Sequence, residues 1–220
     1  MLKRHTALAA LLAALALPAF AADPVPPADA ALDARVEDFL AHKRADWGQG
    51  INRWNVPESG ARHMHDLVRE RDHTRILDIG TSTGHSALWL AWAAAKNGGT
   101  VLTIEVDPAR HAEAVRNFEA SGLAPYIDAR LADAHALVEE LPGPWDFVFQ
   151  DADKGWSLNY WNAVKDKITP RGCFAMDHVT HSSNPAIVAF ADAVRADARF
   201  EHYSFDMGGF DLFVACRGAP

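Results

Sequence analysis

Residues 75–90 read Arg75-Ile-Leu-Asp-Ile-Gly-Thr-Ser-Thr-Gly-His-Ser-Ala-Leu-Trp-Leu90, and this stretch decides the fold. It predicts a buried strand over residues 76–79, a tight glycine-bounded loop over residues 80–84 and a helix that runs to Lys96. The glycine where the strand ends lets the backbone approach a ligand closely, and the helix presents free N–H groups at its start. The stretch therefore predicts a ligand site at the end of this strand.

A second apolar run, Val101-Leu-Thr-Ile-Glu-Val-Asp107, follows one helix later and carries Glu105 near its end. A carboxylate there can accept hydrogen bonds from both hydroxyls of a ribose, which predicts a nucleoside-containing cofactor. A dinucleotide loop requires Gly-x-Gly-x-x-Gly, but position 82 is Ser. The loop is Asp-x-Gly-x-x-x-Gly, and its Asp78 would repel a pyrophosphate but suits a ligand that carries an ammonium and a sulfonium. This loop resembles the S-adenosylmethionine loop of class I methyltransferases.

The same loop also fits a hydrolase motif. Gly80-Thr-Ser82-Thr-Gly84 is Gly-x-Ser-x-Gly, the nucleophile elbow of α/β-hydrolases, in which Ser82 would be the nucleophile of a serine hydrolase. An α/β-hydrolase places several strands before its elbow, whereas only a short and mostly helical segment precedes residue 76 here. The hydrolase alternative also leaves Glu105 and the Asp-Ala-Asp-Lys run at residues 151–154 unexplained. The sequence therefore favours the methyltransferase.

The N-terminus has the pattern of a cleaved secretory signal peptide over residues 1–21. Lys3 and Arg4 form its positive region, residues 6–17 are apolar, and Ala19-Phe-Ala21 is an A-x-A cleavage site. The apolar run is too short for a transmembrane anchor, so we expect an exported protein, periplasmic or secreted, with no membrane contact after cleavage. Residues 22–28 would then be a linker, and residues 29–220 a single domain.

The formal net charge of −8 over 220 residues argues against nucleic acid as a partner, because the chain has no basic run. We expect a small-molecule acceptor as the partner, and a homodimer is compatible with the sequence.

Five apolar runs alternate with helices, which predicts a parallel sheet covered on both faces. The third, fourth and fifth runs are residues 126–131, 146–150 and 173–177, and a helix over residues 158–168 should end at Pro170 and Gly172. Two last strands, near residues 201–205 and 210–216, have only a turn between them and should form an antiparallel hairpin. We therefore predict an α/β fold, doubly wound and Rossmann-like, with a mostly parallel seven-stranded sheet and a C-terminal β-hairpin. This ending marks the class I methyltransferase fold.

Acidic side chains occur where the predicted strands end, which is where open α/β sheets bind ligands. They are Asp78, Glu105, Asp133, Asp151 and Asp177. Each could instead cap the helix that follows, and for Asp133 both roles stay open. Their number exceeds what capping alone requires, and the set predicts one site.

Four segments resemble the O-methyltransferase family of catechol and caffeoyl-coenzyme A methyltransferases. They are Ile-Leu-Asp-Ile-Gly-Thr-Ser-Thr-Gly-His-Ser, Thr-Ile-Glu-Val-Asp-Pro, Leu-Ala-Asp-Ala and Phe-Val-Phe-Gln-Asp-Ala-Asp-Lys. The likeness runs from about residue 55 to residue 217. It implies transfer of a methyl group from S-adenosylmethionine to a hydroxyl of a small catechol- or phenol-like acceptor.

The resemblance also implies roles for single residues. The cofactor-binding residues would be Asp78, Gly80 and Ser86 at the methionine end, Glu105 at the ribose, Asp133 at the adenine side, and Asp151. The family's divalent metal, usually magnesium, would be bound by Asp151, Asp177 and His178. Lys154 would help to deprotonate the acceptor and, with Asp151, would form the catalytic pair.

Two positions depart from the family pattern, because His178 replaces an Asn and Ser157 replaces a Tyr. Asn suits magnesium, whereas imidazole suits zinc, iron, copper or nickel. A softer metal at the site and a metal-free site with His178 as general base therefore both stay open. An exported methyltransferase-like binding protein without turnover is a further alternative, because S-adenosylmethionine is made in the cytosol.

The two cysteines permit one disulfide in an oxidising compartment. Cys173 begins the fifth predicted parallel strand and Cys216 ends the last strand, which should run antiparallel beside it. Directly opposed residues there have Cα atoms within the range that a disulfide accepts. Two buried thiols are the alternative, because a register error of one residue would turn the side chains to opposite faces.

Overall fold

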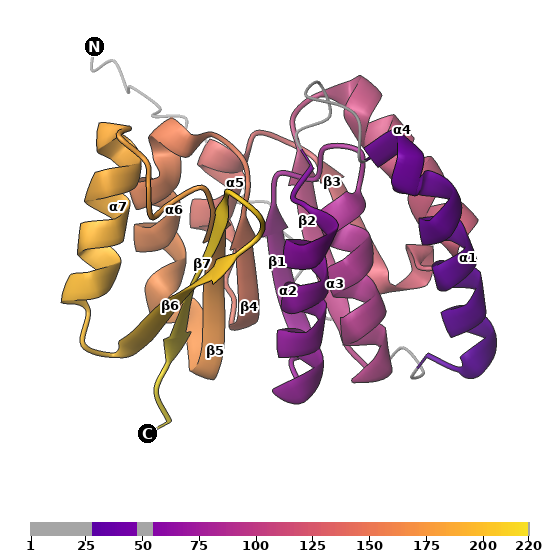
Figure 1. Cartoon of the computed structure of the whole chain (residues 1–220), viewed down its shortest axis with the longest axis horizontal. Helices are drawn as coiled ribbons and strands as arrows, with labels where there is room; N and C mark the ends of the chain where they lie inside the picture. The colour runs from indigo at the N-terminus through magenta and orange to yellow at the C-terminus, as the bar shows by residue number, and fades with distance from the viewer. Residues whose placement is uncertain (1–27, 48–54, 220) are drawn as a thin grey trace, which may run out of the picture.

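A computed structural model describes residues 28–47 and 55–219. The predicted signal peptide and nearly all of the predicted linker lie outside these residues. The described chain forms one seven-stranded sheet in the order β3-β2-β1-β4-β5-β7-β6 (Figure 1). Its strands are β1 Arg75–Ile79, β2 Thr100–Glu105, β3 Ile127–Leu131, β4 Trp145–Gln150, β5 Ile168–Asp177, β6 Phe200–Asp206 and β7 Asp211–Arg217.

Helices cover both faces of the sheet, and each face has its own apolar core (Figure 1). One layer contains α1 Ala30–Trp47, α2 Glu58–Glu70, α3 His85–Lys96 and α4 Pro108–Ser121. The other layer contains α5 Ala134–Glu140, α6 Ser157–Val164 and α7 Pro185–Ala196. Both faces of the central strands are buried, which explains their continuous apolar runs. No helix in the described part of the chain is long and apolar enough to cross a membrane.

The predicted fold is confirmed. Strands β1 to β5 pair in parallel, whereas β7 pairs antiparallel with both β5 and β6. From β1 the chain runs outward through β2 and β3 on one side and then crosses to β4 on the other side, so the strand order reverses at β1. A crevice for a ligand forms at the carboxyl ends of the strands at such a switch point.

The boundary predicted between helix and strand near residue 168 is wrong. Helix α6 ends at Val164, and β5 begins at Ile168 and continues through Pro170 and Gly172. The register against β4 shifts between Trp145 and the residues that follow it, so the segment before Cys173 bulges out of the ladder. A bulge tolerates proline, which has no N–H to donate, and glycine, whose absent Cβ would lie 2.9 Å from the Asp146 carbonyl oxygen. These residues therefore bend a strand instead of ending a helix.

The predicted disulfide is confirmed. Cys173 on β5 lies directly opposite Cys216 on β7, and the two are bonded with a Cα–Cα distance of 4.0 Å. The bond connects β5, whose far end carries Asp177, to the C-terminal hairpin.

Candidate active site

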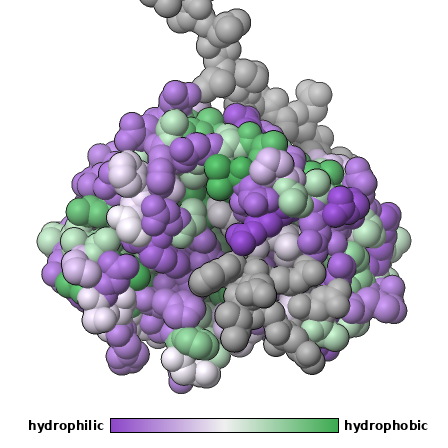
Figure 2. All heavy atoms as spheres, turned by 90° about the horizontal axis from the view of Figure 1, so that it is seen from above, coloured by the Kyte–Doolittle hydropathy of each residue, from purple (hydrophilic) through white to green (hydrophobic). Residues whose placement is uncertain are grey.

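The carboxyl ends of the parallel strands meet at one edge of the sheet, the upper edge in Figure 1. A cavity of about 720 Å³ opens there. Figure 2 looks onto this edge and shows apolar and polar side chains intermingled over it. The cavity is lined by seven of the predicted site residues, namely Gly80, Glu105, Asp133, Asp151, Lys154, Asp177 and His178.

The loop after β1 brings its backbone close to the loop after β4. Gly80 has φ +107°, and a Cβ at this position would lie 2.8 Å from the backbone of Asp151. Only glycine fits this close approach without strain. The N–H of Ser82 then donates to the Glu105 carboxylate at 2.7 Å. Because β1 is the first strand of the described chain, the hydrolase alternative gains no support from the structure.

Three backbone N–H groups hold the buried carboxylate of Glu105 in one orientation. One of its oxygens accepts from Val106 at 3.0 Å and from Asp107 at 2.9 Å, and the other accepts from Ser82. A carboxylate has about four lone-pair sites, so acceptor capacity remains toward the cavity. Glu105 can therefore accept a further hydrogen bond from a ligand hydroxyl without moving.

Asp133 both caps a helix and lines the cavity, so its capping role does not exclude a place in the site. Its carboxylate accepts from the N–H of His135 at 2.9 Å and so caps α5. The same residue lines the cavity, next to the end of β3.

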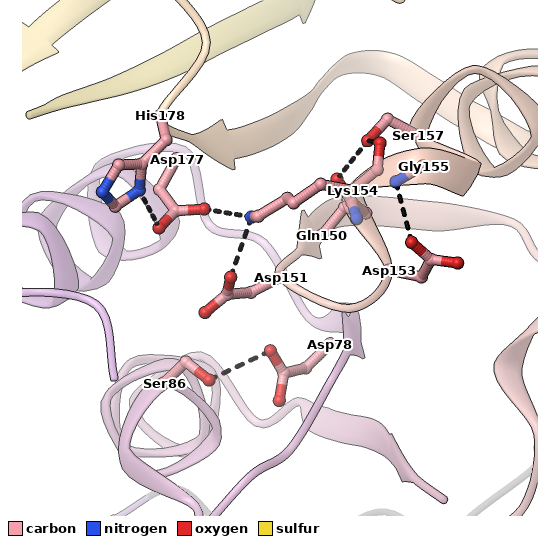
Figure 3. A network of polar contacts seen from close by, with 10 residues as sticks. All are labelled: Asp78, Ser86, Gln150, Asp151, Asp153, Lys154, Gly155, Ser157, Asp177 and His178. Carbon is pink, nitrogen blue, oxygen red and sulfur yellow. Dashed lines mark hydrogen bonds and ion pairs between the residues drawn. The ribbon is translucent and has the colours of Figure 1, made fainter. Parts of the chain in front are cut away.

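Asp78 and Ser86 lie beneath the loop and outside the cavity lining (Figure 3). The Asp78 carboxylate accepts from Thr103 Oγ1 at 2.6 Å and from Ser86 Oγ at 3.2 Å. Complete burial raises the pKa of Asp78 to about 7, although these two hydrogen bonds act in the opposite direction. The predicted role of this pair at the methionine end of a cofactor stays a prediction.

Lys154 lies between the two carboxylates at the ends of β4 and β5 (Figure 3). Its ammonium donates to Asp151 at 2.8 Å and to Asp177. The Nδ1 atom of His178 lies 2.6 Å from the other oxygen of Asp177. Adjacent parallel strands bring these groups together, because Gln150 and Met176 are register partners directly before the two acids.

Burial and the neighbouring charges set the protonation of this cluster. Burial raises the pKa of Asp151 to about 7, although Lys154 opposes the shift. Burial would also raise the pKa of Asp177, but Lys154 and His178 outweigh it and hold that pKa below its usual value. The hydrogen bond to Asp177 raises the pKa of His178. The carboxylates of this cluster therefore keep Lys154 positively charged where it lines the cavity.

The predicted metal ligands do not fit a metal ion in this arrangement. Among the described residues, no group of three or more His, Cys, Asp or Glu side chains could hold one. The Lys154 ammonium lies between Asp151 and Asp177, and Asp177 uses its second oxygen for His178. Lys154 itself supplies the positive charge at this position.

Five further polar residues that line the cavity were not predicted as site residues from the sequence. They are Asn55, Arg110, His135, Asp153 and Tyr160. Tyr160 is 2% exposed and lies on the buried face of α6, whose apolar spacing is typical of core residues. Arg110 lies in the first turn of α4, and the only available signal was the Asp107-Pro108 helix start three residues earlier.

Comparison with known proteins identifies the family, because the family model described as O-methyltransferase matches residues 36–202. The chain belongs to the O-methyltransferase family. It is 42% identical over 108 residues to the catechol O-methyltransferase of Niastella koreensis, an alignment that covers 47% of this chain and 48% of that protein. It is 29% identical over 149 residues to caffeoyl-CoA O-methyltransferase 2 of Eucalyptus globulus, covering 64% and 59% of the two chains. The chain thus spans about half the length of these curated relatives.

Solved structures show the same fold. The O-methyltransferase from Bacillus cereus in complex with SAH superimposes with a TM-score of 0.70 and 24% identity, covering 87% of this chain and 92% of that one. TomG from Streptomyces achromogenes, in complex with SAM, gives a TM-score of 0.69 and 23% identity, covering 89% and 92%.

Proposed function

We propose that this protein is an S-adenosylmethionine-dependent O-methyltransferase that methylates a hydroxyl of a small catechol-like acceptor. One observation carries the proposal: a single cavity joins the fixed carboxylate of Glu105 to the Lys154 cluster at the ends of β4 and β5. The first group suits a ribose and the second suits a developing oxyanion. Relatives named for catechol methylation and solved relatives with SAH or SAM bound support both assignments.

When bound, S-adenosylmethionine supplies an electrophilic methyl group on a sulfonium. The chain's own residues hold the nucleoside at Glu105 and Asp133 and orient the acceptor hydroxyl near Lys154 and Asp151. The acceptor hydroxyl gives its proton to the Asp151 carboxylate, whose pKa burial raises to about 7. The Lys154 ammonium, which donates to Asp151 and Asp177, stabilises the oxyanion that forms. Most of the rate enhancement then comes from positioning and from this fixed charge.

The charge of the cavity favours an acceptor without phosphate groups. Among the residues that the structure describes, Arg110 and Lys154 are the full cations of its lining, which contains five carboxylates, those of Glu105, Asp133, Asp151, Asp153 and Asp177. A coenzyme A ester would bring several negative charges to this site, and like charges repel. We therefore propose an acceptor like that of the catechol methyltransferases, not a coenzyme A ester.

Metal assistance stays a prediction, because Asp151, Asp177 and His178 could bind an ion only if Lys154 turned away. Export likewise stays a proposal, and the disulfide between Cys173 and Cys216 supports it, since such bonds persist in oxidising compartments.

Methyl transfer from labelled S-adenosylmethionine tests the function. We expect methylation of a catechol and none of caffeoyl-CoA, measured with and without a chelator. Turnover that survives the chelator supports the Lys154 site, and turnover that requires added magnesium or zinc supports the predicted metal. Binding of S-adenosylhomocysteine with no turnover of any phenol would instead support a binding protein.

A further inference from the structure

A buried carboxylate next to the active site is not explained by the proposed chemistry. Asp211 begins β7, is 7% exposed and does not line the cavity. Its carboxylate accepts from the N–H groups of Val179 and Thr180, each at 3.0 Å. It also accepts from the hydroxyl of Thr180 and, at 3.2 Å, from that of Ser204 on β6. All four donors lie outside β7.

The backbone of Asp211 extends this contact to the active site. Its carbonyl oxygen accepts from the N–H of His178 at 2.9 Å, so three consecutive N–H groups, those of residues 178–180, bind one residue. The neighbouring residue Leu212 is the register partner of Asp177. Asp211 thus holds the three consecutive residues that follow β5.

This segment needs support, because His178 has φ +59°. A left-handed conformation is uncommon for a residue other than glycine and costs of order 1–3 kcal/mol, so it persists only where the surroundings impose it. The conformation turns His178 toward Asp177 and places it in the cavity lining (Figure 3). Asp211 binds the N–H of His178 and those of the two residues after it, and these hydrogen bonds restrain this conformation.

We propose that Asp211 is a positioning residue for methyl transfer, which acts by holding residues 178–180 and thereby fixes His178 and Asp177 at the acceptor end of the cavity. The inference rests on the proposed function, because it assigns Asp211 to the acceptor and not to the cofactor. The cofactor residues Gly80 and Glu105 lie elsewhere, directly after β1 and at the end of β2.

Asp146 provides a matched control, because it makes the same kind of contact at the opposite edge of the sheet. Its carboxylate accepts from the N–H groups of Thr74 and Arg75 at 3.0 Å each, and from the hydroxyls of Thr74 and Thr169 at 3.1 and 2.9 Å. It lies at the start of β4, at the amino ends of the strands and away from the cavity. Loss of either carboxylate removes two backbone and two hydroxyl hydrogen bonds.

The test compares Asp211→Ala, Asp211→Asn and Asp146→Ala with the wild type at a temperature where all are folded. We expect Asp211→Ala to lower kcat/KM for catechol on the order of 100-fold, the effect of a misplaced catalytic constellation, with unchanged Kd for S-adenosylhomocysteine. Asp211→Asn should recover part of this loss, since its amide oxygen can still accept from the N–H groups. Asp146→Ala should change neither parameter. Amide hydrogen exchange should accelerate at residues 178–180 in Asp211→Ala only.

The inference is overturned if Asp211→Ala keeps the wild-type kcat/KM, or if it weakens S-adenosylhomocysteine binding as much as it lowers kcat/KM. Where Asp211→Ala does not fold, the double variant Thr180→Val, Ser204→Ala removes only the two hydroxyl donors, and it should cause a smaller loss in the same direction. A wild type that binds S-adenosylhomocysteine but methylates no phenol contradicts the proposed function, not this inference. The exchange at residues 178–180 then decides whether Asp211 holds the segment.

Discussion

The disulfide makes a prediction about stability that does not depend on the family. The double variant Cys173→Ser, Cys216→Ser removes the bond between β5 and β7, which closes a loop over a sequence separation of 43 residues. In the chain-entropy model, closing a loop of this length restricts the unfolded chain by about 4 kcal/mol at 25 °C. Because native strain and residual unfolded structure reduce such values, we expect a loss of about 2–4 kcal/mol in the free energy of unfolding.

Urea unfolding followed by circular dichroism measures this loss, and the wild type with a reductant serves as the second measurement. The reduced wild type should unfold at nearly the same urea concentration as the double variant, and the reductant should not affect the variant. A change in the free energy of unfolding below about 1 kcal/mol, or a reductant effect on the variant, would refute the argument from loop closure.

Three further predictions follow from the site. Gly80→Ala should lower the melting temperature and abolish cofactor binding, because its Cβ would lie 2.8 Å from the Asp151 backbone. Gly98→Ala is the control for the backbone conformation alone, because Gly98 has φ +73° but a Cβ added there would have no atom within 4 Å. Lys154→Met should lower kcat on the order of 100- to 1,000-fold in a methyl-transfer assay with S-adenosylhomocysteine affinity retained, as for loss of one oxyanion donor. The control Lys165→Met, at a half-buried lysine outside the cavity lining, should not lower kcat. Burial raises the pKa of Asp78 in the folded state to about 7, so protonation of Asp78 stabilises the folded state as the pH falls. The free energy of unfolding of the wild type should therefore rise relative to that of Asp78→Asn between pH 8 and pH 5. A difference between the two proteins that does not change with pH would contradict this burial effect.

Much of the site could be predicted because it follows from strand ends. Parallel strands carry their last residues to one edge, so the sequence alone predicts that Glu105 and Asp151 lie in one site. The Cys173–Cys216 bond followed in the same way from the antiparallel pairing of β5 and β7. The shared site required only the direction and order of the strands, whereas the disulfide also required the register of β5 against β7.

The remaining features depend on side-chain geometry that periodicity does not encode. The bulge before Cys173 reflects the register of β4 against β5, and Pro170 and Gly172 alone indicated the end of a helix. The placement of Lys154 between two carboxylates results from a contact across 23 residues, which the motif around Asp151 does not reveal. The role of Asp211 was also hidden, because its partners lie 31 and 32 residues away in the sequence and no motif connects them.

Isothermal titration with S-adenosylhomocysteine tests the central claim most directly. We predict that the wild type binds this ligand, and that Glu105→Ala weakens binding by roughly 2–4 kcal/mol, as expected for loss of hydrogen bonds to a charged group. Asp107→Ala is the control, because Asp107 follows Glu105 closely but uses its carboxylate to cap α4. Its affinity should stay at the wild-type value. A wild type that does not bind S-adenosylhomocysteine, or a Glu105→Ala variant that binds it unchanged, would contradict the account.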